Sequence, residues 1–230
     1  MKAAAPLVIF DLDGTLVDTG PDLLDSLNHT IGGVGLEPVV LDDLNHLVGQ
    51  GARAMIGRAF QMRALPLPAE EGDRLLAVFL EHYTANMPGR SAPFPGLVDA
   101  MAAFDDAGFT MAVCTNKTET LSLRLLETLD LASRFRAIVG GDTLPYKKPD
   151  GRHLLGTVER AGGVKAMTVM VGDSVNDIQA ANDAGIPSIG VPFGYTDVPI
   201  SDLKPTRVID HFSQLTPALI HELLEPAPVS

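Results

Sequence analysis

Four short apolar runs along the chain are each followed by polar or glycine-rich residues and then by a stretch with helical periodicity. None of these runs alternates apolar with polar positions, which is typical of strands buried on both faces. They lie at 7–10, 110–114, 137–141 and 168–172, with weaker runs at 187–191 and 207–210. Helices are expected between them, at about 96–107, 117–131, 150–161 and 175–184. This alternation predicts an α/β fold: a Rossmann-like parallel sheet with right-handed crossovers.

One long stretch interrupts the alternation. Between Asp18 and Gly89 there is no convincing strand, and Pro21 stands at a plausible first helical position. Helical patterns continue at 40–49, 52–60 and 70–87, and the proline-rich segment 91–96 is expected to return the chain to the sheet. The sequence therefore predicts an α/β core of residues 1–17 and 90–230, with an all-helical domain of residues 18–89 inserted after the first strand.

Some helix ends are also legible. Asn116 followed by Glu119 predicts a capping box at the start of one core helix. The pair Gly162-Gly163 and Gly185 stand where a helix ends in a residue with positive φ.

The composition narrows the possible partners. Of the 230 residues, 46% are hydrophobic and 20% charged, as in ordinary globular proteins. The formal net charge of −12 argues against a nucleic-acid partner, since such proteins usually carry positive charge. The single cysteine, Cys114, can form no intrachain disulfide, and the apolar runs are too short to span a bilayer. We expect a cytoplasmic monomer or homodimer with no membrane partner.

Polar side chains follow the carboxyl ends of the predicted strands, where open α/β sheets bind their ligands. They are Asp11 and Asp13 after the first strand, Thr115 and Asn116 after the second, Lys148 after the third, and Asp173 and Asp177 after the fourth. Clustered carboxylates repel one another unless a cation joins them. Because oxygen ligands without nearby histidine or cysteine suit Mg²⁺, the sequence predicts a magnesium site at this edge.

These residue types fit phosphoryl transfer. A carboxylate such as that of Asp11 can attack phosphorus and form an aspartyl-phosphate. Lys148, the Thr115 hydroxyl and backbone N–H groups would stabilise the phosphoryl oxygens. Asp13, two residues beyond Asp11 in a turn, would protonate the leaving oxygen and then activate water. Asn116 fits either a helix cap or a substrate contact, and Lys147 competes with Lys148.

Four segments resemble the motifs of the haloacid dehalogenase superfamily, in the same order and over essentially the whole chain. They are FDLDGTLVD at 10–18, CTN at 114–116, KKP at 147–149 and GDSVND at 172–177. The resemblance implies that Asp11 is the nucleophile and Asp13 the general acid and base. It also implies that Thr115 and Lys148 hold phosphate, and that Asp173 and the Asp13 carbonyl bind Mg²⁺. By this resemblance Asp177 supports the metal directly or through water, although it also fits a capping arrangement with Ser174.

Softer features resemble the phosphoglycolate phosphatase branch of that superfamily, at 16–23, 48–55, 93–96 and 192–196. This implies a helical cap at 18–89 and a small phosphorylated substrate, first of all 2-phosphoglycolate, hydrolysed to glycolate and phosphate. Alternatives are a sugar phosphate such as N-acetylmuramate 6-phosphate, or transfer of the β-phosphoglucomutase kind. A phospho-acceptor signalling domain is disfavoured because such domains carry no helical insertion.

Two residues of the insertion are candidates for substrate recognition. Gly51 would let the backbone approach a ligand closely. Arg53 would pair bidentately with a substrate carboxylate, or else be a solvated helix residue.

Overall fold

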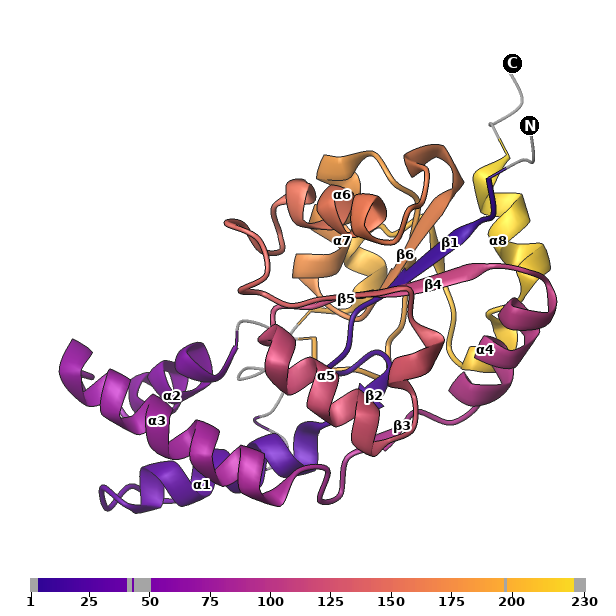
Figure 1. The fold of residues 1–230 in the computed structure, drawn as a ribbon. Coiled ribbons are helices and arrows are strands. Elements are labelled where there is room, and N and C mark those ends of the chain that lie inside the picture. Colours follow the sequence, from indigo (N-terminus) through magenta and orange to yellow (C-terminus); the bar gives the residue numbers. More distant parts are fainter. Residues whose placement is uncertain (1–3, 41–42, 44–50, 197, 226–230) are drawn as a thin grey trace.

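The computed structural model describes residues 4–40, 43, 51–196 and 198–225, and its main feature is a parallel sheet of six strands (Figure 1). The strand order is β5-β4-β1-β6-β7-β8. The strands are β1 (Leu7–Phe10), β4 (Thr110–Cys114), β5 (Ala137–Val139), β6 (Thr168–Gly172), β7 (Ser188–Gly190) and β8 (Arg207–Val208). All six predicted runs are strands, which confirms the α/β fold. The third is shorter than predicted because the Gly140 amide turns away to donate to Thr143 Oγ1 at 2.8 Å.

Helices cover both faces of this sheet. They are α4 (Leu97–Asp106), α5 (Glu119–Thr128), α6 (Gly151–Arg160), α7 (Val175–Ala184) and α8 (Pro217–Leu224). Residues Val8 and Phe10 of β1 pack into one apolar cluster with α4, α5 and α8, whereas Leu7 and Ile9 pack into a second cluster with α6 and α7. Short 3₁₀ helices are η2 (Ala132–Arg134), η3 (Lys165–Met167), η4 (Ile200–Leu203) and η5 (Phe212–Gln214). Burial on both faces explains why these strands are continuously apolar.

The helix ends were predicted in part. Gly162 and Gly185 have φ of +67° and +61°, as expected after helices α6 and α7. The predicted capping box at Asn116 is wrong, because α5 begins later and has Thr118 as its N-cap. The Asn116 side chain instead donates to the carbonyl of Lys148 at 3.0 Å.

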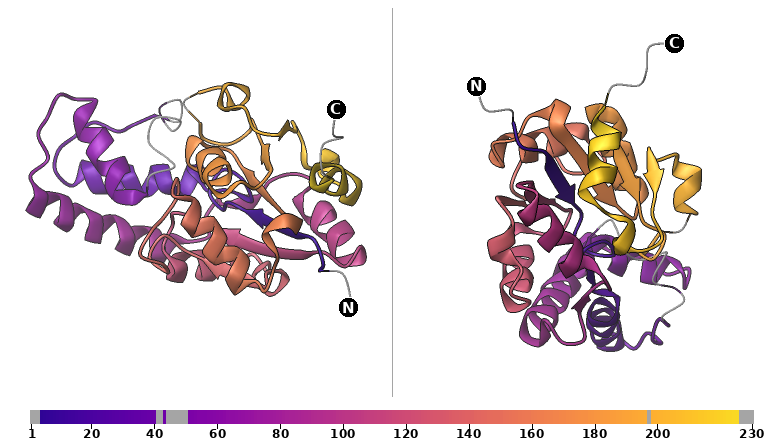
Figure 2. Two further views of the ribbon diagram at one scale, coloured as in Figure 1. Left: turned by 90° about the horizontal axis from the view of Figure 1, so that it is seen from above. Right: turned by 90° about the vertical axis from the view of Figure 1, so that its right-hand side faces the viewer.

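Among the residues that the structure describes, three α-helices lie between the first strand and α4, and they extend beyond the carboxyl end of β1 (Figures 1 and 2). They are α1 (Gly20–Gly32), α2 (Ala52–Gln61) and α3 (Ala69–Asn86), here called the three-helix segment. Pro21 stands in the first turn of α1 as predicted. The helix predicted at 40–49 lies almost entirely outside the described residues.

A small feature joins the three-helix segment to the rest of the chain. Strand β2 (Val17–Asp18) pairs antiparallel with β3 (Ala92–Pro93), although the sequence predicted only a linker there. Asp22 in the first turn of α1 accepts the amides of Arg90 and Ser91 at 2.8 and 3.0 Å. The segment of chain that enters the three-helix segment and the one that leaves it are thereby held side by side.

The helices that the structure describes include none with the length and hydrophobicity of a membrane span.

Candidate active site

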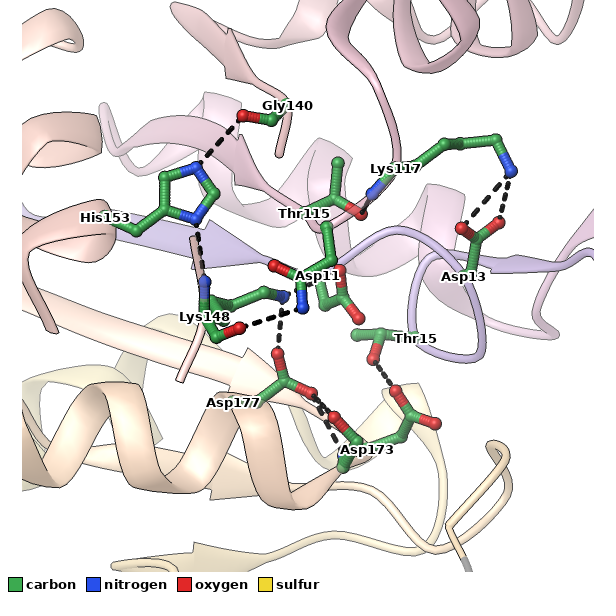
Figure 3. Close-up of polar contacts among 12 residues, drawn as sticks. Asp11, Asp13, Thr15, Thr115, Lys117, Gly140, Lys148, His153, Asp173 and Asp177 are labelled. Carbon is green, nitrogen blue, oxygen red and sulfur yellow. Dashed lines mark hydrogen bonds and ion pairs between the residues drawn. The ribbon is translucent and has the colours of Figure 1, made fainter. Parts of the chain in front are cut away.

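Three carboxylates meet beyond the carboxyl ends of the central strands (Figure 3). Asp11 follows β1, Asp173 follows β6, and Asp177 lies in the first turn of α7. One oxygen of each lies within 4.8 Å of the others, and all three residues are buried. Because β1 and β6 are adjacent and in register, their ends bring acids from distant parts of the sequence together.

A single buried lysine faces two of these acids. Lys148 Nζ lies 2.8 Å from Asp11 Oδ1 and 2.6 Å from Asp177 Oδ1, and its side chain is 1% exposed. Although burial disfavours the ammonium, the two carboxylates raise the pKa of Lys148, so it stays charged. Lys147 is exposed. The geometry therefore selects Lys148 from the two candidate lysines.

The backbone of Lys148 is held on both sides. Its amide donates to His153 Nδ1 at 3.2 Å, and the other ring nitrogen lies 3.1 Å from the Gly140 carbonyl oxygen. Burial, followed by the nearby Lys148 ammonium, lowers the pKa of His153 to about 4. Since the Lys148 carbonyl also accepts from Asn116, the loop that carries this lysine is fixed before any ligand binds.

The other two acids are held by hydrogen bonds. Asp173 accepts from the Thr15 hydroxyl at 2.9 Å and from the Tyr195 amide at 2.7 Å. Asp177 accepts from the amide and hydroxyl of Ser174 at 3.0 and 2.7 Å, so it caps α7 as well as facing the cluster. Asp177 thus forms the capping arrangement with Ser174 that the sequence allowed, while its other oxygen faces Lys148.

The charges of this cluster suit a divalent cation. Burial, against the opposing effect of Lys148, raises the pKa of Asp11 to about 6. Burial and the neighbouring acids Asp177 and Asp11 raise the pKa of Asp173 well above its ordinary value. When all three carboxylates are ionised, the single ammonium of Lys148 compensates only one of them and leaves two negative charges. The donor set is made of oxygen atoms, which fits Mg²⁺.

Asp13 lies outside this cluster and has a different partner. Its carboxylate oxygens accept from Lys117 Nζ at 2.9 and 3.2 Å (Figure 3). Lys117 Nζ also lies 4.5 Å from the centre of the Tyr83 ring, which comes from α3. Gly14 allows the turn after Asp13: its φ is +85°, and a Cβ there would lie 2.5 Å from Asp173 Oδ2. Sequence analysis missed Lys117 and Tyr83, although Lys117 directly follows the Thr115-Asn116 pair.

A cavity of about 240 Å³ lies between this edge of the sheet and the three-helix segment. Its polar wall includes the sequence-predicted residues Asp11, Asp13, Thr115, Asn116 and Lys148. Its apolar wall comes from α2 and α3 and includes Met55, Leu76, Phe79, Leu80 and Tyr83. A cavity with polar and charged groups on one wall and apolar groups on the other can bind a small ligand away from bulk water.

The two predicted recognition residues, Gly51 and Arg53, also line this cavity. Gly51 has φ of +91° and is the N-cap of α2. The Arg53 guanidinium, however, forms an ion pair with Asp73 of α3, and its side chain is half exposed.

Cys114 is buried beneath the cluster. Burial raises the pKa of its thiol to about 11, so the thiol is protonated at neutral pH and is no nucleophile.

Comparison with known proteins places this arrangement in a family. Residues 8–191 match the model of the haloacid dehalogenase-like hydrolases. The chain belongs to the haloacid dehalogenase-like hydrolase family. The matched range includes the four motifs and the three-helix segment, so the resemblance read from the sequence is confirmed at the level of the family.

Individual relatives extend the likeness over nearly the whole chain. A phosphoglycolate phosphatase of Agrobacterium fabrum is 58% identical over 97% of this chain and 96% of its own. One of Mesorhizobium japonicum is 49% identical over 96% of this chain and 98% of its own. The crystal structure of a predicted phosphoglycolate phosphatase from Haemophilus somnus superposes with a TM-score of 0.86 at 29% identity, covering 94% of this chain and 98% of that one.

Proposed function

We propose that this protein is a Mg²⁺-dependent phosphatase that hydrolyses 2-phosphoglycolate to glycolate and phosphate. The observation that carries the proposal is the buried cluster of Asp11, Asp173 and Lys148, of which Asp11 and Lys148 line a cavity sized for a small molecule. The choice of substrate is supported by relatives named phosphoglycolate phosphatase, to which the chain is similar over nearly their full length. The chain then divides into a core of residues 1–17 and 90–230 and a cap of residues 18–89.

The chemistry would proceed in two steps. An oxygen of Asp11 bonds to phosphorus while the bond from phosphorus to the glycolate oxygen breaks, and that oxygen keeps the electron pair and takes a proton from Asp13. A water then attacks phosphorus and gives its proton to Asp13, and the bond from Asp11 to phosphorus breaks to release phosphate. The cap would exclude bulk water during the first step.

The remaining residues would bind and orient the reactants. Asp11, Asp173 and the main-chain carbonyl of Asp13 would hold Mg²⁺, with Asp177 in support; when bound, this ion would offset negative charge on the phosphoryl oxygens. Thr115 and Lys148 would hold the phosphoryl group. Asn116 would act mainly by holding the Lys148 loop.

Arg53, at the cavity wall beside Gly51, would bind the substrate carboxylate through an ion pair. It would have to exchange its Asp73 partner for the ligand. We expect Arg53→Ala to raise KM for 2-phosphoglycolate without a matching change for a phosphate ester that lacks a carboxylate. Equal kcat/KM for 2-phosphoglycolate in Arg53→Ala and wild type would remove this role.

The test is a ranking of substrates by kcat/KM with Mg²⁺ present. We expect 2-phosphoglycolate to rank above N-acetylmuramate 6-phosphate and β-glucose 1-phosphate. Asp11→Asn should lower kcat by at least about 10³-fold because it removes the nucleophile. Asp106→Asn, at an exposed acid of α4, is the matched control and should retain activity. Substantial turnover by Asp11→Asn would refute the mechanism, and a sugar phosphate ranked first would refute the substrate.

A further inference from the structure

Lys117 lies where three separate parts of the chain meet. It follows β4, pairs with Asp13 beyond β1, and contacts the Tyr83 ring of α3. Its side chain is 6% exposed, although it ends in a charged group. An ammonium is buried only where partners offset its loss of hydration, and here these are one carboxylate and one aromatic face.

The geometry at Asp13 constrains its side chain. Two N–H bonds of one ammonium reach the two oxygens of one carboxylate, at 2.9 and 3.2 Å. Holding both oxygens limits rotation of the carboxylate about its own side-chain bonds. A general acid and base must lie within hydrogen-bond reach of the atom that it serves, so a group that fixes its orientation contributes to the rate.

The Lys117 backbone is itself fixed. Its amide donates to Thr115 Oγ1 at 3.2 Å, and its carbonyl accepts from the Gly141 amide at 2.8 Å. The far end of the side chain rests on the ring face of Tyr83, a residue that is 1% exposed. Tyr83 thus presents its ring to Lys117 from α3.

We propose that Lys117 is a positioning residue that holds the Asp13 carboxyl in place for proton transfer, and that the ring of Tyr83 seats Lys117 from the three-helix segment. This inference rests on the proposed function. When the bond from phosphorus to the leaving oxygen breaks, that oxygen takes the proton of Asp13, and Lys117 keeps its own three protons. Lys117 thus acts through Asp13 and transfers nothing itself.

Three substrates distinguish this role from others. 2-Phosphoglycolate has a poor leaving group and a carboxylate, ethyl phosphate has a poor leaving group alone, and p-nitrophenyl phosphate has a leaving group that needs no proton. Because kcat/KM reports steps up to release of the first product, a mispositioned acid should affect only the first two. We expect Lys117→Met to lower kcat/KM for both alkyl phosphates by roughly 10- to 100-fold, and for p-nitrophenyl phosphate by less than about 3-fold.

Other patterns overturn the proposal. A loss on 2-phosphoglycolate alone means that Lys117 binds the substrate carboxylate. An equal loss on all three substrates means that it only supports the structure. The double variant Asp13→Asn/Lys117→Met gives an independent measure: if Lys117 acts through Asp13, adding Lys117→Met to Asp13→Asn changes kcat/KM for ethyl phosphate by less than about 3-fold. Fully multiplicative losses contradict the proposal.

Tyr83 supplies a second route should Lys117→Met fail to fold. Tyr83→Leu removes the ring face and should reproduce the contrast between alkyl and aryl phosphates. Tyr83→Phe keeps the ring and should retain most of the wild-type kcat/KM for the alkyl phosphates. A Tyr83→Phe variant as impaired as Tyr83→Leu would contradict the seating role. The wild-type enzyme distinguishes the two proposals. If wild type does not turn over 2-phosphoglycolate, the proposed function is refuted. If wild type is active and Lys117→Met has the same kcat/KM, only this inference is refuted.

Discussion

Replacing Lys148 by methionine should destabilise the protein strongly in the absence of divalent cations. The two ion pairs of this lysine span 2.6 and 2.8 Å, and at an effective dielectric constant of 20 each has a gross attraction of about 6 kcal/mol. Loss of the lysine also removes its desolvation cost, and the acids left behind can take up protons. The net loss of unfolding free energy should therefore be about 3–5 kcal/mol, as for other broken buried pairs. For a chain of this size, Tm should fall by roughly 6–20 °C.

The assay is urea unfolding at neutral pH with a chelator present. Lys147→Met is the matched control, because Lys147 is adjacent in sequence and exposed, and it should change the unfolding free energy by less than about 0.5 kcal/mol. In the double variant Lys148→Met/Asp177→Asn the losses should be less than additive, since the second change removes one of the stranded charges. Equal stability of Lys148→Met and Lys147→Met would refute the account of the cluster.

Three further results are expected. Mg²⁺ at about 100 times its dissociation constant should raise the unfolding free energy by about 2.7 kcal/mol in wild type but not in Asp173→Asn. Thermal unfolding with a chelator and with Mg²⁺ measures this difference. A stabilisation of Asp173→Asn by Mg²⁺ equal to that of wild type would exclude Asp173 as a ligand. Asp22→Ala should cost about 2–4 kcal/mol because it strands the amides of Arg90 and Ser91, measured by urea unfolding, and a loss below about 1 kcal/mol would contradict this. Because the pKa of His153 is about 4 in the fold and roughly 6.5 when unfolded, the unfolded state takes up the proton first as pH falls between these values. Stability should accordingly fall by up to about 3 kcal/mol more in wild type than in His153→Gln between pH 6.5 and 4, and parallel pH curves would exclude the effect.

Much of the core could be predicted because its signals are local. The continuous apolar runs mark strands with two buried faces, and β1, β4 and β6 have the predicted bounds. The acids follow those strands directly, so a parallel sheet brings Asp11 and Asp173 together whatever the loops do. The same reasoning predicted that Lys148 lies at the same edge.

The errors and omissions have a common cause in long-range partners. Asn116 has the residue type of a helix cap, but its side chain donates a hydrogen bond to a carbonyl 32 residues away in the sequence. Nothing in the local pattern connects Lys117 with Tyr83, because the contact exists only once α3 lies across the sheet edge. Arg53 was predicted either to bind a substrate carboxylate or to be a solvated helix residue; it lines the cavity, and its pairing with Asp73 could not be deduced from sequence. Strand β2 has only two residues, too few for any periodicity to show.

The short ladder of β2 and β3 has a consequence for how such a chain can diversify. Val17 pairs with Pro93 and Asp18 with Ala92, so the chain leaves for the three-helix segment and returns from it at neighbouring points. Everything from 19 to 91 can be exchanged as a block by cutting and rejoining at neighbouring points, with no strand of the large sheet disturbed. The roof of the cavity would change while Asp11, Asp173 and Lys148 stayed where they are. A new block can therefore bring a different ligand-facing wall to the same acids and lysine, provided that it again places an aromatic ring against Lys117 as Tyr83 does here.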